Sequence, residues 1–253
     1  MPRSGSTLLS NILAQNHALH VTGTSGLPSM LWNFYDNWNK DKVIKATENS
    51  NKRKTVLKGM FESYHDTGKQ YVFNKSRTWL AIIDMVEAFL QKPVRIIVNI
   101  RHINGILSSF EKLYQADIRA LQSTNADMEY MMIQKSRIEH LMSDRGLIGA
   151  AYNSIMNAVH TGHRDKLLPV DYDYFTRNPE LCLKTMYDFL EIPAYEHDFN
   201  NIKQTIFEND AEFGLMNLHA IRPHIDIRPD DSHAVLGPYA NQFQHWDYGF
   251  LKQ

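Results

Sequence analysis

The chain has 253 residues, of which 43% are hydrophobic and 22% are charged, and its formal net charge at pH 7 is −1. These values are ordinary for a globular protein with one substantial core, and they exclude a strongly basic nucleic-acid-binding protein. No run approaches the roughly 20 apolar residues of a membrane span, and the single cysteine, Cys182, excludes an intramolecular disulfide. We therefore expect one soluble domain over residues 1–253 in a reducing, cytoplasmic compartment.

The first seven residues are small, hydroxyl-rich and basic, and they lead directly into an apolar stretch with helical spacing. The first N–H groups of a helix have no partner inside the helix, and the helix dipole adds partial positive charge there. Gly5 would let the backbone approach an anion, Ser4, Ser6 and Thr7 offer hydroxyl donors, and Arg3 offers a forked, charged donor. The segment is interpreted as an anion-binding loop; an ordinary Ser/Thr helix cap is the alternative.

Further along the chain, segments with helical apolar spacing alternate with short β-branched runs. The pattern predicts helices at 6–16, 27–38, 51–66, 78–90, 106–115, 126–160 with a break near 143–146, and 178–190, and strands at 19–22, 71–73, 94–100 and 167–170. This alternation predicts an α/β fold with a central parallel sheet flanked by helices. An anion loop of this kind normally follows a buried strand, so we expect that leading strand to be absent or replaced by another segment.

Polar residues follow three of the predicted strands, where ligands bind in open α/β sheets. The buried run 94–100 ends at Arg101, and Ser109 lies eight positions later in the next predicted helix. Lys75 follows the strand at 71–73, and Tyr172 follows the strand at 167–170. Taken singly, each has a simpler interpretation: a surface ion pair for Arg101, a solvent-facing helix residue for Ser109, an exposed lysine for Lys75 and a core tyrosine for Tyr172.

Together these segments resemble the family of sulfotransferases that use 3′-phosphoadenosine 5′-phosphosulfate (PAPS). Residues 2–7 match the family's P-[KR]-S-G-[ST]-T loop, and the strand–Arg–x7–Ser pattern at 94–109 is similar to its second motif. The Asn-Lys-Ser run at 74–76 and the segment 172–179 resemble two further elements of the family. Arginine at position 3 is the form found in tyrosylprotein sulfotransferases and their bacterial relatives. The resemblance covers residues 2–190, and the segment 208–253 shows little periodicity.

The resemblance implies a P-loop-like, three-layer fold and PAPS as co-substrate, with no metal. It places Arg3, Ser4, Gly5, Ser6 and Thr7 at the 5′-phosphosulfate, Arg101 and Ser109 at the 3′-phosphate, and Tyr172 at the adenine end. Arg3 and Lys75 are then the catalytic residues that stabilise charge on the transferring group and on the leaving oxygen. The twelve histidines show no spacing typical of a metal site, although His219, His224 and His233 draw attention.

The general base is not identified by this comparison. The run 21–25 holds no carboxylate where tyrosylprotein sulfotransferases have a glutamate, and Ser76 and Arg77 stand where cytosolic sulfotransferases have a histidine. The weak candidates nearby are His17, His20, Glu62 and His65, and each is more simply interpreted as a surface residue.

The sequence therefore predicts transfer of a sulfonyl group from PAPS to a hydroxyl or amine of a small molecule, carbohydrate or peptide. One alternative is a non-catalytic protein of this fold that binds PAPS or its product, 3′-phosphoadenosine 5′-phosphate (PAP). The other is a P-loop nucleotide phosphotransferase, against which the missing G-x-x-x-x-G-K-[ST] motif counts. Neither nucleic acid nor a membrane is expected as a partner.

Overall fold

The computed structural model describes the chain except residues 48, 117–127, 214–216, 228, 244 and 252–253. Within this part, the strands are β1 (Leu19–Thr24), β2 (Tyr71–Lys75), β3 (Ile96–Ile100) and β4 (Leu167–Asp171). β1 pairs with β2 and β3 pairs with β4, both in parallel. Because parallel strands need a crossover connection, each pair has helices between its strands. The predicted α/β class, with parallel strands flanked by helices, is confirmed.

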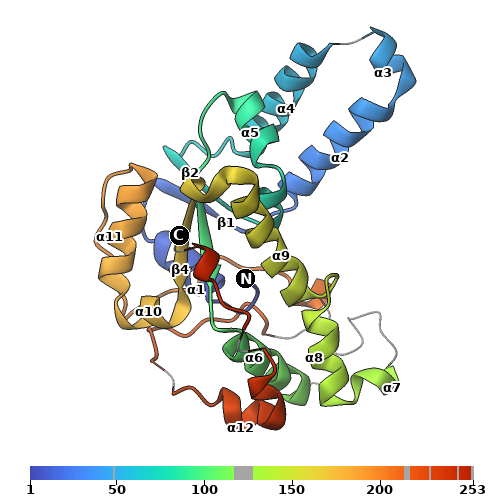
Figure 1. Cartoon of the computed structure of the whole chain (residues 1–253). Coiled ribbons are helices and arrows are strands. Elements are labelled where there is room, and N and C mark those ends of the chain that lie inside the picture. Colours follow the sequence, from blue (N-terminus) through green and yellow to red (C-terminus); the bar gives the residue numbers. More distant parts are fainter. Residues whose placement is uncertain (48, 117–127, 214–216, 228, 244, 252–253) are drawn as a thin grey trace.

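Helices surround the strands on both sides and extend beyond them (Figure 1). They are α1 (Ser6–Leu13), α2 (Leu27–Lys40), α3 (Lys42–Thr47), α4 (Ser50–Tyr64), α5 (Ile83–Leu90), α6 (Ile103–Ala116), α7 (Met128–Met131), α8 (Gln134–Met142), α9 (Leu147–Ala158), α10 (Tyr172–Arg177), α11 (Pro179–Leu190) and α12 (Ser232–Leu236). None of the helices in the described ranges is long and apolar enough to cross a membrane.

The predicted elements are present, and two of them differ in form. The helix expected at 78–90 begins as a 3-10 helix, Arg77–Ala81, and continues as α5. The helical stretch expected at 126–160 is divided into α7, α8 and α9, and its first two residues lie outside the described ranges. The sequence analysis did not predict α10, which begins because the Asp171 side chain accepts a hydrogen bond from Tyr174 N at 2.9 Å.

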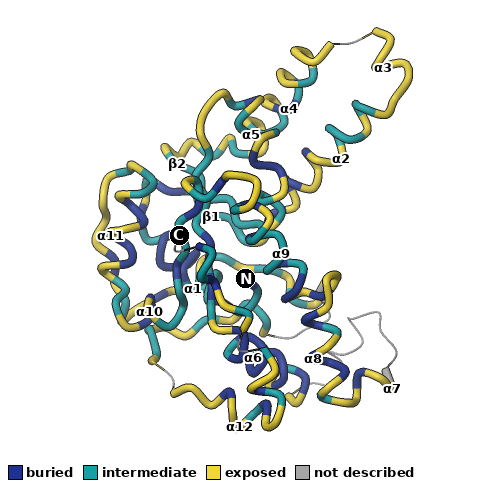
Figure 2. The backbone as a smooth tube through the Cα atoms, viewed as in Figure 1, coloured by how far each residue is buried: buried dark blue, intermediate teal, exposed yellow. Residues whose placement is uncertain are grey.

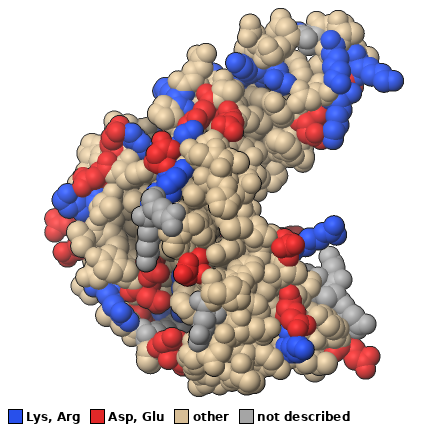
Figure 3. All heavy atoms as spheres, viewed as in Figure 1, with Lys and Arg blue, Asp and Glu red and all other residues tan. Residues whose placement is uncertain are grey.

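Three apolar clusters form the core. The first lies between α6, α8, α9 and the C-terminal segment and includes Ile106, Leu141 and Leu236. The second joins α1, β1, β4 and α11, and the third joins α2, α4 and α5. α2, α3 and α4 form an arm that extends from the body of the molecule, and its tip is exposed while its base is buried (Figures 1 and 2). The surface is hollowed between this arm and the opposite end of the molecule (Figure 3).

A cavity of about 1250 Å³ separates the two strand pairs. Residues 72–75 of β2 and 96–99 of β3 line it, whereas no residue of β4 does. β2 and β3 therefore face each other across the cavity, and each is paired on its other side only. The main chain at Met1 lies at the end of this space, where its amino nitrogen donates to Asn99 O at 2.6 Å. Residues of the predicted anion loop, from Met1 to Thr7, line the same cavity apart from Ser4.

The segment after α11 has little regular structure, yet it packs closely against the body. Its backbone pairs with itself, as Ile202 N donates to Pro223 O at 2.6 Å and Ile225 N to Phe199 O at 3.3 Å. The side-chain oxygen of Asn11 in α1 accepts from Thr205 N at 2.7 Å and from Ile206 N at 2.9 Å. These contacts fix residues 202–213 and 217–225 beside α1, and this position brings side chains such as His219 to the cavity.

Candidate active site

The anion loop is tightly wound where it enters α1. Arg3 and Gly5 have positive φ angles of 52° and 78°, and Gly5 is the residue immediately before the helix. A Cβ atom on Gly5 would lie 2.4 Å from Cδ2 of Tyr172, so the ring of Tyr172 occupies the space that any side chain would need. Glycine at position 5 is therefore required both by the backbone conformation and by the close approach of Tyr172.

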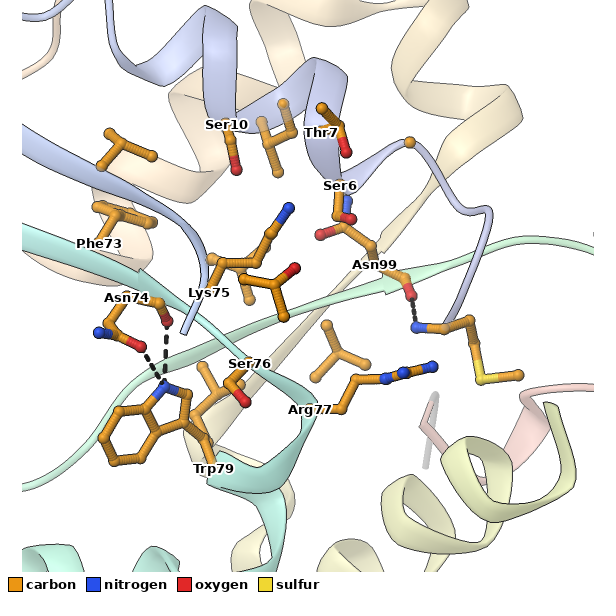
Figure 4. A pocket seen from close by; sticks show the side chains of 18 of the residues that line it. Ser6, Thr7, Ser10, Phe73, Asn74, Lys75, Ser76, Arg77, Trp79 and Asn99 are labelled. Atoms are coloured by element: carbon orange, nitrogen blue, oxygen red, sulfur yellow. Dashed lines mark hydrogen bonds between the residues drawn. The ribbon is translucent and has the colours of Figure 1, made fainter. Parts of the chain in front are cut away.

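Ser4 holds the loop against β3. Its side chain is 1% exposed, and its Oγ lies 2.6 Å from Met1 O and 3.2 Å from Asn99 O. The Ser4 hydroxyl therefore fastens the loop to the end of the strand, and what Ser4 offers an anion is its main chain. Ser6 and Thr7, by contrast, line the cavity at the start of α1 (Figure 4).

The structure brings Arg3, Arg101, Ser109 and Tyr172 together from four separate parts of the chain. Arg3 Nε donates to Ser109 Oγ at 3.0 Å, and Arg101 Nη1 donates to the carbonyl oxygen of Arg3 at 3.3 Å. The guanidinium carbon of Arg101 lies 4.6 Å from the centre of the Tyr172 ring, a cation–π contact. The predicted site residues at the ends of β3 and β4 thus surround the loop.

Arg101 is half-buried, and one of its donors is unused. Among the described residues its Nε has no hydrogen-bond partner, although the atom is inaccessible to solvent. Gly105 makes room for it, because a Cβ at that position would lie 2.9 Å from Nε. Tyr248 donates to the backbone oxygen of Arg101 at 3.0 Å and so fixes the residue from the C-terminal side. A guanidinium with a buried N–H that lacks a partner is an arrangement that an anion can complete.

Lys75, at the end of β2, points toward Ser6 and Thr7 (Figure 4). Its Nζ forms a salt bridge of 2.5 Å with Glu208 Oε1, and its backbone N donates to Thr22 Oγ1 at 3.0 Å. Glu208 is nearly inaccessible, with a side chain 7% exposed, and it packs against Gly23, where a Cβ would lie 3.0 Å from its Cγ. Burial alone raises the pKa of Glu208, but hydrogen bonds from Lys75 and Thr24 and the positive charge of Lys75 outweigh it and lower that pKa.

Two more side chains extend this group. His219 Nε2 lies 3.5 Å from Glu208 Oε2, and His219 Nδ1 lies 2.5 Å from Asp210 Oδ1. The sequence analysis considered His219 only as one of three histidines that suggest a metal, and it did not identify Glu208 or Asp210. No periodicity or motif in the tail marks these residues, because tertiary packing alone brings them to Lys75.

Arg77 is a second cation that the sequence analysis did not assign to the site. It lies just past β2 and extends into the cavity (Figure 4). Its side chain is exposed to the cavity but surrounded by protein atoms, and this desolvation lowers the pKa of its guanidinium. Arg77 forms no ion pair with a residue that the structure describes, and an arginine in such surroundings favours binding of an anion.

The four candidate bases do not gather at the loop. His65 lines the cavity, but its Nδ1 lies 2.9 Å from Phe61 O and its Nε2 lies 2.9 Å from Asn74 Nδ2, so both nitrogens are engaged. Burial lowers the pKa of His65. Glu62 is exposed and 3.7 Å from Lys58, and His17 is exposed beside Tyr195. His20 is half-buried in β1, outside the cavity lining.

No three His, Cys, Asp or Glu side chains come together as a metal site would require, as far as the described residues go. The structure is thus an α/β protein in which a loop at a helix N-terminus and cations at the ends of parallel strands adjoin one cavity. Residues 1–247 match the family model described as the sulfotransferase domain, and the chain belongs to the sulfotransferase family.

Among solved structures, the chain is similar to one described as the sulfotransferase domain from the curacin biosynthetic pathway. The TM-score is 0.56 at 16% sequence identity, and the match covers 94% of this chain and 89% of that chain. At this identity the likeness supports the fold alone. A search of curated protein sequences gave no match.

Proposed function

We propose that the protein transfers the sulfonyl group of PAPS to a hydroxyl or amine of a small-molecule, carbohydrate or peptide acceptor. One observation carries the proposal: in a chain of the sulfotransferase family, the anion loop, Arg101, Ser109 and Lys75 converge on one cavity. The volume of about 1250 Å³ leaves room for a nucleotide together with an acceptor.

The residues present fit the nucleotide. The main-chain N–H groups at the start of α1, with Ser6 and Thr7, would hold the 5′-phosphosulfate. The buried Nε of Arg101 has no partner among the described residues, and a 3′-phosphate would supply one. Ser109 belongs to the same group, because it accepts a hydrogen bond from Arg3, whose carbonyl oxygen accepts one from Arg101. The Tyr172 ring, packed between Gly5 and Arg101, would border the nucleotide.

The two cations proposed as catalytic differ in position. Arg3 donates to Ser109 Oγ and, through Nη1, to Leu218 O at 2.6 Å, so its side chain lies on the proposed 3′-phosphate side of the loop. Lys75 points toward the start of α1, where the phosphosulfate would lie. We therefore assign stabilisation of the leaving oxygen chiefly to Lys75 and nucleotide binding chiefly to Arg3, with Arg77 as a further cation near the sulfonyl group.

Sulfonyl transfer needs little covalent chemistry from the protein. As in phosphoryl transfer, the moving group carries charge on its outer oxygens, and the barrier falls when acceptor and donor are held in line beside fixed positive charge. Lys75 is paired with Glu208 in this structure, so it must exchange part of that contact for the phosphosulfate.

The test is acceptor-dependent release of PAP from PAPS. The protein is incubated with PAPS and a panel of phenols, primary alcohols, sugars and amines, and PAP is quantified. We expect release above the rate with water for at least one acceptor class, and its reduction in Lys75→Met.

A second function has one observation in its favour. The 2.5 Å salt bridge to Glu208 neutralises Lys75, which suits a protein that binds nucleotide without turnover. Tight binding of PAP with no release from PAPS by any acceptor would establish this non-catalytic role instead.

A further inference from the structure

The irregular C-terminal segment holds a carboxylate–imidazole–carboxylate group whose imidazole lines the cavity. Asp210, His219 and Glu208 follow one another through space, with contacts of 2.5 Å at His219 Nδ1 and 3.5 Å at His219 Nε2. All three side chains are largely removed from solvent, at 16%, 16% and 7% exposure. His219 lines the large cavity, whereas Glu208 lines a smaller neighbouring cleft.

Asp210 contacts His219 through both of its carboxylate oxygens. Its Oδ2 accepts from the backbone N of His219 at 3.1 Å, and its Oδ1 lies 2.5 Å from the ring Nδ1. A carboxylate accepts hydrogen bonds, so Nδ1 is the nitrogen that donates to Asp210, and in the neutral tautomer with this proton Nε2 would carry the lone pair. This is the arrangement in which a carboxylate orients an imidazole as a general base.

The histidine is also tied to both cations of the proposed reaction. The residue before it, Leu218, accepts a 2.6 Å hydrogen bond from Arg3 Nη1 through its carbonyl oxygen. On the other side, Glu208 lies between His219 Nε2 and Lys75 Nζ. Glu208 therefore links the Nε2 edge of the imidazole to the lysine that points toward the start of α1.

We propose that His219 is the general base that activates the acceptor, with Asp210 as its positioning residue. The inference rests on the proposed sulfonyl transfer. The acceptor hydroxyl oxygen attacks sulfur and forms a new S–O bond, the S–O bond to the 5′-phosphate breaks, and its electron pair leaves with PAP. The hydroxyl proton passes to His219 Nε2, and the carboxylates of Asp210 and Glu208 stabilise the resulting imidazolium.

Glu208 is the less suitable base, although it is closer to Lys75. Its carboxylate accepts hydrogen bonds from Lys75 and Thr24, and these lower its pKa, so it holds a proton poorly. His65, the other histidine of the cavity near β2, has its Nε2 engaged by Asn74 at 2.9 Å. His219 is the histidine of the cavity lining that has a carboxylate on its Nδ1 and Lys75 within the same network.

The decisive variants are His219→Ala and His219→Gln, with His224→Ala as the matched control. His224 lines the same cavity, is 52% exposed and pairs with Asp226 at 2.7 Å, outside the network of Lys75. The measurements are kcat for PAP release from PAPS with the acceptor panel and with water, the Kd for PAP, and the Tm without nucleotide. We expect kcat to fall about 10²–10⁴-fold in both His219 variants, while Kd for PAP stays unchanged. Free imidazole should restore part of the activity of His219→Ala and none of the activity of Lys75→Met.

The outcomes separate this inference from the proposed function. Retained kcat in both His219 variants overturns the assignment and leaves sulfonyl transfer standing. If the unmodified protein does not bind PAP, the proposed function is overturned. PAP binding without release from PAPS by any acceptor contradicts both catalytic statements and identifies a binding protein.

The positioning role of Asp210 can be tested by a measurement that needs no acceptor substrate. Nitrogen-15 NMR of the imidazole rings, assigned by comparison with His219→Gln, should show His219 as the neutral tautomer with the proton on Nδ1. In Asp210→Asn that tautomer preference should weaken, and kcat should fall with little change in KM for PAPS. A ring protonated on Nε2 in the unmodified protein would overturn the proposal.

Discussion

Arg101 is the residue whose surroundings most directly indicate an anion, because its buried Nε has no partner among the described residues. We predict that Arg101→Ala weakens binding of PAP by about 1.5–3 kcal/mol, the scale of a hydrogen bond to a charged group. Adenosine 5′-phosphate, which lacks the 3′-phosphate, should bind nearly as before. Isothermal titration calorimetry with the two nucleotides gives both values, and equal losses would refute the 3′-phosphate assignment.

Gly5 is constrained by its backbone and by its neighbour. Gly5→Ala should lower the free energy of unfolding by about 1–3 kcal/mol, because the new methyl group meets Tyr172 and the φ of 78° disfavours a side chain. Gly59→Ala is the control, since Gly59 lies on the exposed side of α4 with no atom near its Cβ position, and it should stabilise by about 0.5–1 kcal/mol. Denaturant unfolding measures both, and similar effects at the two positions would contradict this account of the loop.

The lowered pKa of Glu208 predicts how the stability of the folded protein changes with pH. Its pKa in the folded protein lies below the ordinary value of 4.5, so its contribution to stability is present above that value and is lost as the pH falls through the folded pKa. At pH 7, Glu208→Gln should cost about 1.5–3 kcal/mol, and the difference from the unmodified protein should shrink below pH 4.5. Glu62→Gln, at an exposed pair, should cost less than about 1 kcal/mol at either pH. A difference independent of pH would show that Glu208 is not ionised.

At the scale of elements, α6 and α8 are joined by a buried ion pair. Arg137 Nε and Nη2 donate to the two oxygens of Glu111 at 2.9 and 2.6 Å, and Nη1 donates to Met131 O at 3.0 Å. Glu111→Ala leaves the guanidinium unpaired and should cost about 3–5 kcal/mol in unfolding free energy. Lys112→Ala removes the neighbouring exposed pair with Asp231 and should cost at most about 1 kcal/mol. Comparable losses in the two variants would contradict the difference in burial.

The elements that the sequence predicted well are those with a local signal. The loop and α1, the run 94–100 and the position of Arg101 follow from contiguous patterns of strand, turn and helix. The division of 126–160 into three helices was only partly visible, since the break near 143–146 marked the boundary of α8 and α9. The cluster of Glu208, Asp210 and His219 was not predictable in this way, because Asn11 fixes that segment through backbone contacts nearly 200 positions away in sequence.

At the scale of the molecule, two strand pairs and the C-terminal segment enclose one cavity. β2 contributes Lys75, β3 leads to Arg101, the loop leads into α1, and the C-terminal segment contributes His219 with Asp210 and Glu208 beside it. The segment that looked least informative in sequence therefore completes the site. In this chain of the sulfotransferase family, the proposed anion site and the proposed base therefore adjoin the same cavity.

The most direct test of the central claim is thermal unfolding with PAP, adenosine 5′-phosphate or ATP with Mg²⁺. Ligand at about 100 times its Kd stabilises a fold by about 2.7 kcal/mol, and since 1 kcal/mol shifts Tm by about 2–4 °C in a chain of this size, Tm should rise by roughly 5–10 °C. We predict that PAP raises Tm by at least this amount, that adenosine 5′-phosphate raises it less, and that ATP with Mg²⁺ leaves it nearly unchanged. Equal shifts with all three nucleotides, or no shift with PAP, would contradict a site built for a 3′-phosphorylated nucleotide.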